Sequence, residues 1–229
     1  MTWTSFLYAT RCQIDRIDAR LSELESLVYL HFESLPLASL PPLTLQELPP
    51  VAYSYEFEFC PISEIPAWVA DWTQLRRLFF RGLKLTAFPS PLLNLTNLIE
   101  LGVDMTPLYT IPTTFGYAYP NLLFLHLSGT NLSTLPSSLV HLEHLEKVYL
   151  GGNGFETAED LPWSTETMLS KDFFLRGNPL CDHDPLFQNH RICTAGCSAF
   201  CFYANDNWCQ GPICNTTECN YDGGDCWNE

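Results

Sequence analysis

The segment 122–145, LLFLHLSGTNLSTLPSSLVHLEHL, decides the fold of this protein. Its leucines recur at fixed intervals, at Leu122, Leu125, Leu127, Leu132, Leu135, Leu139 and Leu142, with Thr130 at the ninth position. The same spacing returns when the sequence is shifted forward by roughly 23 residues or back by roughly 24. Copies in register begin at Thr4, Leu27, Ala52, Leu75, Leu98, Leu122, Leu145 and Ser170. Such a repeat predicts an array of identical structural units rather than one compact domain.

The repeated pattern, L-x-x-L-x-L-x-x-(N/C/T)-x-L-x-x-L-P, resembles that of the leucine-rich repeat family over residues 1–180. Within each copy the L-x-L alternation favours a short strand with one buried face. One repeat cannot bury its own apolar face, but stacked repeats build a continuous core. The resemblance therefore implies an α/β-type leucine-rich repeat solenoid, with short parallel strands on its concave face.

The register also predicts which side chains point outward from the concave sheet. The middle row contains Tyr8, His31, Glu56, Phe79, Gly102, His126, Tyr149 and Phe174. Exposed aromatic residues beside charges are typical of protein-binding surfaces. We therefore expect Tyr8, His31, Phe79, His126, Tyr149 and Phe174 to contact a partner. The alternative is that these side chains pack on one another and only stabilise the sheet.

Charged residues flank this row. Arg77 and Arg81 lie between two acidic pairs, Glu56 with Glu58 and Glu100 with Asp104. We interpret them as a solvated ladder of ion pairs.

Cys12 and Cys60 occupy the turn position that Asn153 and Asn178 hold in later repeats. They lie two repeats apart, which at strand spacing is roughly 10 Å and beyond the reach of a disulfide. We expect both to be buried free thiols.

The chain is acidic, with 26 Asp and Glu residues against 11 Lys and Arg and a net charge of −15. Such a chain repels phosphate backbones and anionic lipid headgroups, which disfavours binding to nucleic acids or membrane surfaces. No apolar run approaches the roughly 18 residues of a membrane span. The sequence also lacks G-x-S-x-G, H-E-x-x-H and glycine-rich phosphate motifs, so we expect no enzymatic activity. His183, between two aspartates, is interpreted as part of a polar loop.

The cysteines divide the chain, because eight of the ten lie between Cys181 and Cys226. This crowding predicts a boundary near residue 180 and a tail held by disulfides or metal. Residues 181–196 are expected to cap the array. Cys181 and Cys193 remain once the next six cysteines are grouped, and a disulfide between them would contribute about 3 kcal/mol.

From Cys197 the spacing is C-x3-C-x7-C-x4-C-x4-C-x6-C, ending in C-N-Y-D-G-G-D-C. Residues 197–229 resemble the Notch-type LNR module, which binds calcium and contains three disulfides. The resemblance implies the pairs Cys197–Cys219, Cys201–Cys214 and Cys209–Cys226, whereas the sequence alone allows about 15 connectivities.

The residues of this tail also suit calcium without the family. Asp222 and Asp225 flank two glycines, so the loop can fold back and direct both carboxylates to one point. By alignment on the cysteines, Asp206, Asp222 and Asp225 match the family's side-chain ligands for Ca²⁺. A plain solvated turn and a zinc site are the alternatives.

A disulfide-rich tail indicates a secreted or cell-surface protein. Three N-x-S/T triplets, at Asn94, Asn131 and Asn215, offer sites for N-glycosylation. The first residues do not resemble a signal peptide, and no polar cap precedes Thr4, which we interpret as an incomplete N-terminus.

Taken together, these patterns predict an extracellular recognition protein that binds a protein or peptide, or a surface glycan, on the concave face. One alternative is a structural spacer or shield within a larger cell-surface receptor. Another is an intracellular leucine-rich repeat regulator whose tail cysteines are reduced or bind zinc.

Overall fold

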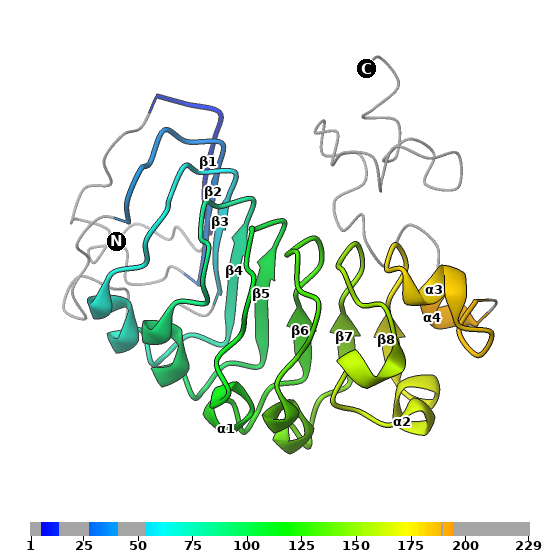
Figure 1. Cartoon of the computed structure of the whole chain (residues 1–229). Helices are drawn as coiled ribbons and strands as arrows, with labels where there is room; N and C mark the ends of the chain where they lie inside the picture. The colour runs from blue at the N-terminus through cyan, green and yellow to red at the C-terminus, as the bar shows by residue number, and fades with distance from the viewer. Residues whose placement is uncertain (1–5, 14–27, 41–53, 189, 195–229) are drawn as a thin grey trace, which may run out of the picture.

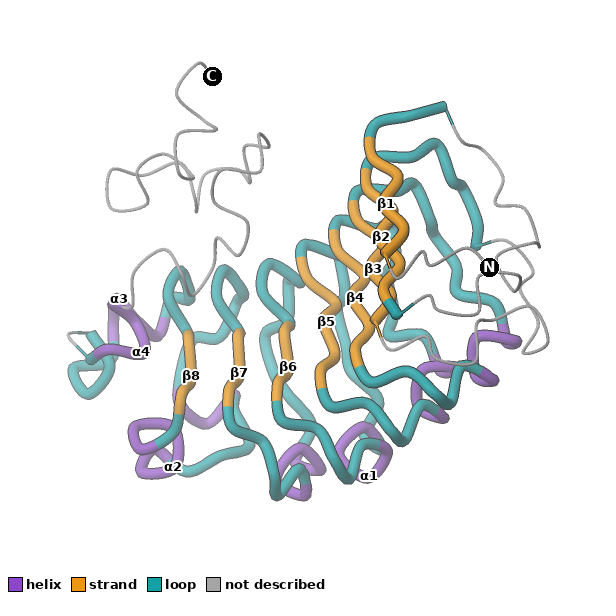
Figure 2. The backbone as a smooth tube through the Cα atoms, turned by 180° about the vertical axis from the view of Figure 1, so that it is seen from behind, coloured by secondary structure: helices purple, strands orange, loops and turns teal. Residues whose placement is uncertain are grey.

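The computed structural model of the chain describes residues 6–13, 28–40, 54–188 and 190–194. Its centre is one sheet of eight parallel strands whose spatial order follows the chain. The strands are β1 (Phe6–Thr10), β2 (Tyr29–Glu33), β3 (Ser54–Glu58), β4 (Arg77–Arg81), β5 (Glu100–Asp104), β6 (Phe124–His126), β7 (Lys147–Tyr149) and β8 (Asp172–Phe174). Figures 1 and 2 show them side by side, one strand in each coil of a curved array.

Short helical segments lie in the return parts of the coils from β3 to β7, and α3 and α4 follow β8 at the end of the array (Figure 2). They are η2 (Ala67–Asp71), η3 (Ser90–Asn94), α1 (Phe115–Ala118), η4 (Ser137–His141), η5 (Ala158–Asp160), α2 (Thr165–Ser170), α3 (Leu180–His183) and α4 (Arg191–Thr194). Pro66, Pro89 and Pro136 immediately precede η2, η3 and η4 with extended backbones. Proline fixes φ where a helical turn begins and offers no N–H there, which explains the L-P pair of the repeat.

The core fills the space between the sheet and these helical segments. Along each strand the residues of the L-x-L pair point inward; in β4, Leu78 and Phe80 are each 0% exposed. Large aromatic residues continue this core under the earlier strands, where Trp72 packs edge-on against Tyr55 with ring centroids 5.1 Å apart. One continuous cluster of buried apolar residues therefore runs from Leu30 to Cys193.

The residue after the strand segment has a positive φ in all eight repeats. Four of these residues are glycines, and the others are Arg11, Ser34, Phe59 and Met105. Their N–H groups continue the sheet's ladder past the strands; for example, Met105 N donates to the Ser128 carbonyl at 2.8 Å. This left-handed column was not predicted, because half of its members carry side chains that usually avoid such φ values.

Two asparagines secure the later turns. The Oδ1 atom of Asn153 accepts hydrogen bonds from the N–H groups of Thr130 and Leu132. Its Nδ2 donates to the carbonyls of Leu127 and Leu150 at 2.7 and 2.9 Å. Asn178 repeats this arrangement one coil later. The side chain therefore satisfies buried backbone groups inside the bend, which is what the turn position requires.

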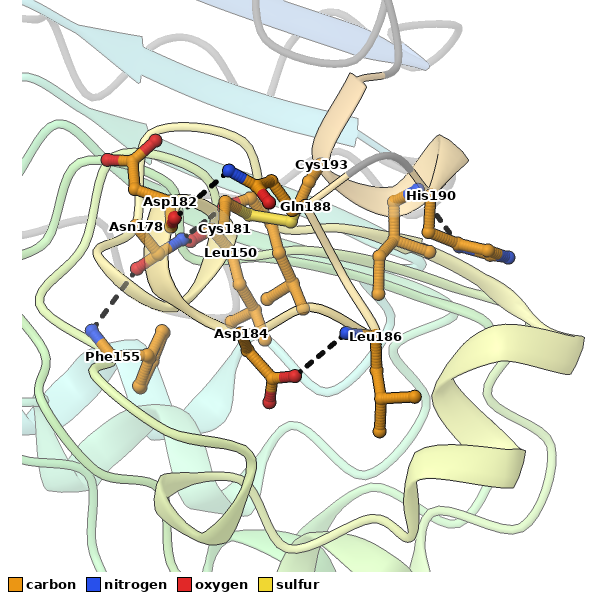
Figure 3. Close-up of a disulfide and its surroundings, with 12 residues drawn as sticks. Leu150, Phe155, Asn178, Cys181, Asp182, Asp184, Leu186, Gln188, His190 and Cys193 are labelled. Atoms are coloured by element: carbon orange, nitrogen blue, oxygen red, sulfur yellow. Dashed lines mark hydrogen bonds between the residues drawn. A yellow bond between two sulfur atoms is a disulfide. The ribbon is translucent and has the colours of Figure 1, made fainter.

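A disulfide joins Cys181 and Cys193, the pair expected to cap the array (Figure 3). The loop that it closes spans 12 positions and carries Phe187 and Ile192, each 0% exposed, onto the end of the core. Arg191 ties the same loop to β8, since its guanidinium contacts the Asp172 carboxylate at 2.7 Å.

Candidate ligand-binding face

The sheet register places the expected middle row as predicted. Tyr8 pairs with His31, His31 with Glu56, and the row continues through Phe79, Gly102, His126 and Tyr149 to Phe174. The spacing of the leucines was sufficient for this prediction because a shift of one residue would turn every inward side chain to solvent.

The exposure predicted for this row is wrong for most of it. Tyr8 is 60% exposed, but His31, His126 and Tyr149 are 9%, 5% and 9% exposed. Phe79 and Phe174 are half-buried. The structure therefore matches the alternative expectation, in which these side chains pack on one another.

The reason is stacking along the row. The rings of His126 and Tyr149 lie 4.4 Å apart and nearly parallel, and Phe174 continues the stack at 4.7 Å from Tyr149. Adjacent strands lie about 4.8 Å apart, so flat side chains at equivalent positions cover each other's faces. Only the edges of these rings remain available to a partner.

Gly102 interrupts the row, and Phe79 fills the gap. A Cβ atom at Gly102 would overlap the ring of Phe79. Without it, Phe79 reaches across to His126, two strands away, with ring centroids 5.2 Å apart.

The charged residues beside the row are also less exposed than predicted. Glu58, Arg81 and Asp104 are only 4%, 4% and 3% exposed, so the expected solvated ladder is wrong for them. The curved sheet brings neighbouring rows close enough to cover one another. Arg77 alone keeps an exposed side chain, with its Nε 2.7 Å from Glu100.

These residues surround a hollow of about 210 Å³ on the concave face. It is lined by Glu58, Arg77, Phe79, Arg81, Glu100, Asp104 and His126. The hollow combines four kinds of contact that a ligand could use: carboxylates, guanidinium groups, an imidazole and a phenyl ring.

The carboxylates around the hollow differ in their ionisation. Burial raises the pKa of Glu58 to about 7, although the charge of Arg81 opposes this. Burial likewise raises the pKa of Asp104, against the charges of His126 and Arg81. Burial acts the same way on Glu100, but the hydrogen bond with His126 and the charges of His126 and Arg77 outweigh it and hold that pKa below its ordinary value.

A second polar cluster lies beside the hollow, between β2 and β3. The Tyr29 hydroxyl donates to Glu56 Oε2 at 2.7 Å, and His31 Nδ1 lies 3.1 Å from the same oxygen. Burial lowers the pKa of His31, but the hydrogen bond to Glu56 and the charges of nearby glutamates outweigh it and raise the pKa overall. The sequence placed these residues in rows but did not group them, because they are 25 positions apart in the chain.

The remaining predicted sites divide into those the structure describes and those it does not. Asn94 and Asn131 are exposed. Cys60 is a buried free thiol as expected, whereas Cys12 is free but only half-buried, since β1 has no described strand on its outer side. The expected calcium ligands Asp206, Asp222 and Asp225, the six cysteines from Cys197 to Cys226, and Asn215 lie outside the described residues.

Sequence comparison finds no matching family model and no matching curated protein. Solved structures do match the fold. An LRR protein of Leptospira interrogans, LIC12759, superposes with a TM-score of 0.58 at 23% identity, over 73% of this chain and 47% of that one. Internalin C2 of Listeria monocytogenes gives 0.60 at 18% identity, over 78% and 76%. The functional domain of InlJ from the same species, which includes a cysteine ladder, gives 0.56 at 20% identity, over 76% and 35%.

The chain thus spans less than half the length of two of these three proteins. Within its described residues, no helix has the length and apolar character needed to cross a membrane. The neighbours are all leucine-rich repeat proteins, and the eight-stranded sheet has the same architecture. The described part of this chain therefore has the leucine-rich repeat solenoid fold.

Proposed function

We propose that this protein is an extracellular, non-enzymatic recognition protein that binds a protein or peptide on its concave leucine-rich repeat face. The observation that carries the proposal is the hollow between β3 and β6, in which acidic, basic and aromatic side chains converge on one face. A hollow of this composition offers several contacts for a peptide with polar side chains.

The exposed part of the face defines what a partner can touch. Phe6 and Tyr8 are 59% and 60% exposed on β1, and the exposed Arg77 borders the hollow. Large aromatic residues and arginine are the side chains that most often contribute binding energy at protein interfaces. Tyr149 and His126 contribute ring edges instead, since their faces are covered.

The test uses exposed residues, because substituting the stacked ones would also destabilise the sheet. Proteins captured by the immobilised full chain are identified by mass spectrometry, and the affinity of each identified partner is then measured. The double variant Tyr8→Ser, Arg77→Ala is expected to lose affinity at least tenfold. Tyr109→Ser removes a tyrosine that is 63% exposed outside the sheet and serves as the matched control. Equal affinities of the face variant and the control would refute binding at the concave face.

For the tail we propose a calcium-binding module over 197–229, separated from the array (1–180) by the capping segment 181–196. Its support is the cysteine spacing and the placing of Asp206, Asp222 and Asp225. Chelation should lower the melting temperature of the tail, and Asp222→Ala with Asp225→Ala should remove that response. A melting temperature that does not respond to chelator would rule the module out.

The extracellular location has its own test. Intact mass before and after alkylation should give two free thiols, Cys12 and Cys60, and four disulfides. Ten free thiols would support the intracellular alternative.

A further inference from the structure

One histidine and two carboxylates meet on the concave face between β2 and β3. A ligand atom from each of His31, Glu56 and Glu58 lies within 4.8 Å of the other two. Within this cluster, His31 Nδ1 and Glu56 Oε2 are 3.1 Å apart. Two donor atoms bound to the same tetrahedral zinc ion are about 3.3 Å apart. This pair therefore already has the spacing of two zinc ligands, and the third ligand atom lies within 4.8 Å of both.

The three side chains differ in how their hydrogen-bonding capacity is used. Glu56 is held by Tyr29 and, more weakly, by Ser54. The carboxylate of Glu58, in a residue only 4% exposed, makes no side-chain hydrogen bond or ion pair with any residue that the structure describes. Arg81 and His31 act on it only through their charges. A buried carboxylate held in this way lacks a direct partner, which a bound cation would supply.

The cluster is open on one side. Glu58 also lines the hollow of about 210 Å³, so an ion entering from the concave face can reach its carboxylate. On the opposite side of the imidazole, His31 Nε2 lies 3.8 Å from Glu33. This carboxylate acts on the ring through its charge, while the other ring nitrogen, Nδ1, faces Glu56.

We propose that His31, Glu56 and Glu58 form a binding site for a divalent transition-metal ion on the concave face. One imidazole nitrogen with two carboxylates suits Zn²⁺ and its neighbours, whereas Ca²⁺ prefers a shell of oxygens alone. Tyr29 holds Glu56 as an outer partner of the site. Three protein ligands leave a coordination position towards the hollow, where water or a carboxylate or imidazole of a bound molecule would complete the shell.

The experiment uses the full chain with its disulfides intact, freed of metal by chelation and titrated with Zn²⁺ in a calorimeter. Wild type is expected to bind one more equivalent of Zn²⁺ than His31→Ala or Glu58→Gln does. If the variants still bind that equivalent, their affinity for it should be at least 100-fold weaker. Glu58→Gln preserves the shape of the side chain, and circular dichroism establishes that it folds. Zn²⁺ should also raise the melting temperature of wild type by several degrees but leave that of Glu58→Gln unchanged.

A matched control is His144→Ala, which removes an exposed histidine beside the exposed Glu143 and Glu146. It should keep the wild-type stoichiometry, and an excess of Ca²⁺ should not displace the zinc at this site. Equal zinc binding by wild type and Glu58→Gln would overturn the proposal, as would the absence of zinc binding by wild type. Loss of the equivalent in His144→Ala would also overturn it, by assigning the ion to a different surface.

Discussion

The middle of the sheet and its C-terminal end cover the same kind of core with different residues on the concave face. In β3 to β5 the strands have five residues, and buried charged side chains such as Glu58, Arg81 and Asp104 lie above them. In β6 to β8 the strands have three residues, and stacked rings run from His126 to Phe174. The inward leucines are common to both regions and set the fold. The outward rows differ between the two regions, and the polar hollow lies where the rows carry charges.

The turns differ in the same way. Asn153 makes strong hydrogen bonds to the preceding coil and within its own, whereas the thiol of Cys60 makes longer contacts with the carbonyls of Glu58 and Phe32, at 3.4 and 3.9 Å. At the turn position, the later coils are therefore held by an amide side chain and the coil of Cys60 by a weaker thiol.

The largest expected effect is the change in the free energy of unfolding when these turn residues are replaced by alanine. Asn153→Ala should lower the free energy of unfolding by about 4 kcal/mol, because it leaves several buried backbone groups without partners. Cys60→Ala should lower it by about 1 kcal/mol. Urea unfolding monitored by circular dichroism measures both, and similar losses would show that the two turns are equivalent.

The next test concerns the aromatic row. Tyr149→Ala should cost about 2 kcal/mol, since it removes a buried ring stacked on both faces. Tyr8→Ala, at the exposed end of the same row, should cost less than about 0.5 kcal/mol. Thermal unfolding of the two variants provides the comparison, and a greater loss for Tyr8→Ala would contradict the observed burial.

Two opposite substitutions test the backbone strain in the column of residues with positive φ. Gly129 has a φ of 65° and space for a Cβ atom, so Gly129→Ala should cost about 1.5 kcal/mol through backbone strain alone. Met105→Gly relieves the same strain but loses chain entropy, and its stability should change by less than about 0.5 kcal/mol. Equal losses in denaturant titrations would mean that strain in this column is negligible.

The smallest effect should appear in how the free energy of unfolding depends on pH through two carboxyl groups of β5. The pKa of Glu100 is lowered in the folded state, so its contribution is present above pH 4.5 and is lost as pH falls through the folded pKa. Glu100→Gln should therefore lower stability by about 1 kcal/mol at pH 7, with the difference vanishing in acid.

Asp104 should behave oppositely, because its pKa is raised above 3.8 in the folded state. Ionising this carboxyl is less favourable in the folded than in the unfolded protein. The free energy of unfolding therefore falls as pH rises through the folded pKa of Asp104. Asp104→Asn should remove that decline and keep the hydrogen bond accepted from Ser128 N. Unfolding curves between pH 3 and pH 8 measure both variants, and slopes of the same sign would contradict the assignment.

The leucine spacing was enough to predict the eight strands and their register, because side chains alternate between the two faces and a shift of one residue would expose the leucines. The grouping of the cysteines, and not the leucines, predicted the disulfide between Cys181 and Cys193. The leucine spacing could not predict burial on the concave face, which depends on contacts between rows such as that of Phe79 with Gly102 and His126. Nor could it predict positive φ at Phe59 or Met105, where the neighbouring coil imposes the conformation.

Gly102 has a consequence for how the concave face could change its specificity. Any side chain at this position would displace the ring of Phe79, which now lies over the glycine. The ring of Phe79 lines the hollow and contacts His126, so its displacement would change the shape of the hollow, whereas the leucines of the core lie on the other face of the sheet. A single substitution at Gly102 could thus alter the recognition chemistry of the face without requiring the scaffold to refold, and it is a natural first position for evolving or engineering a new ligand.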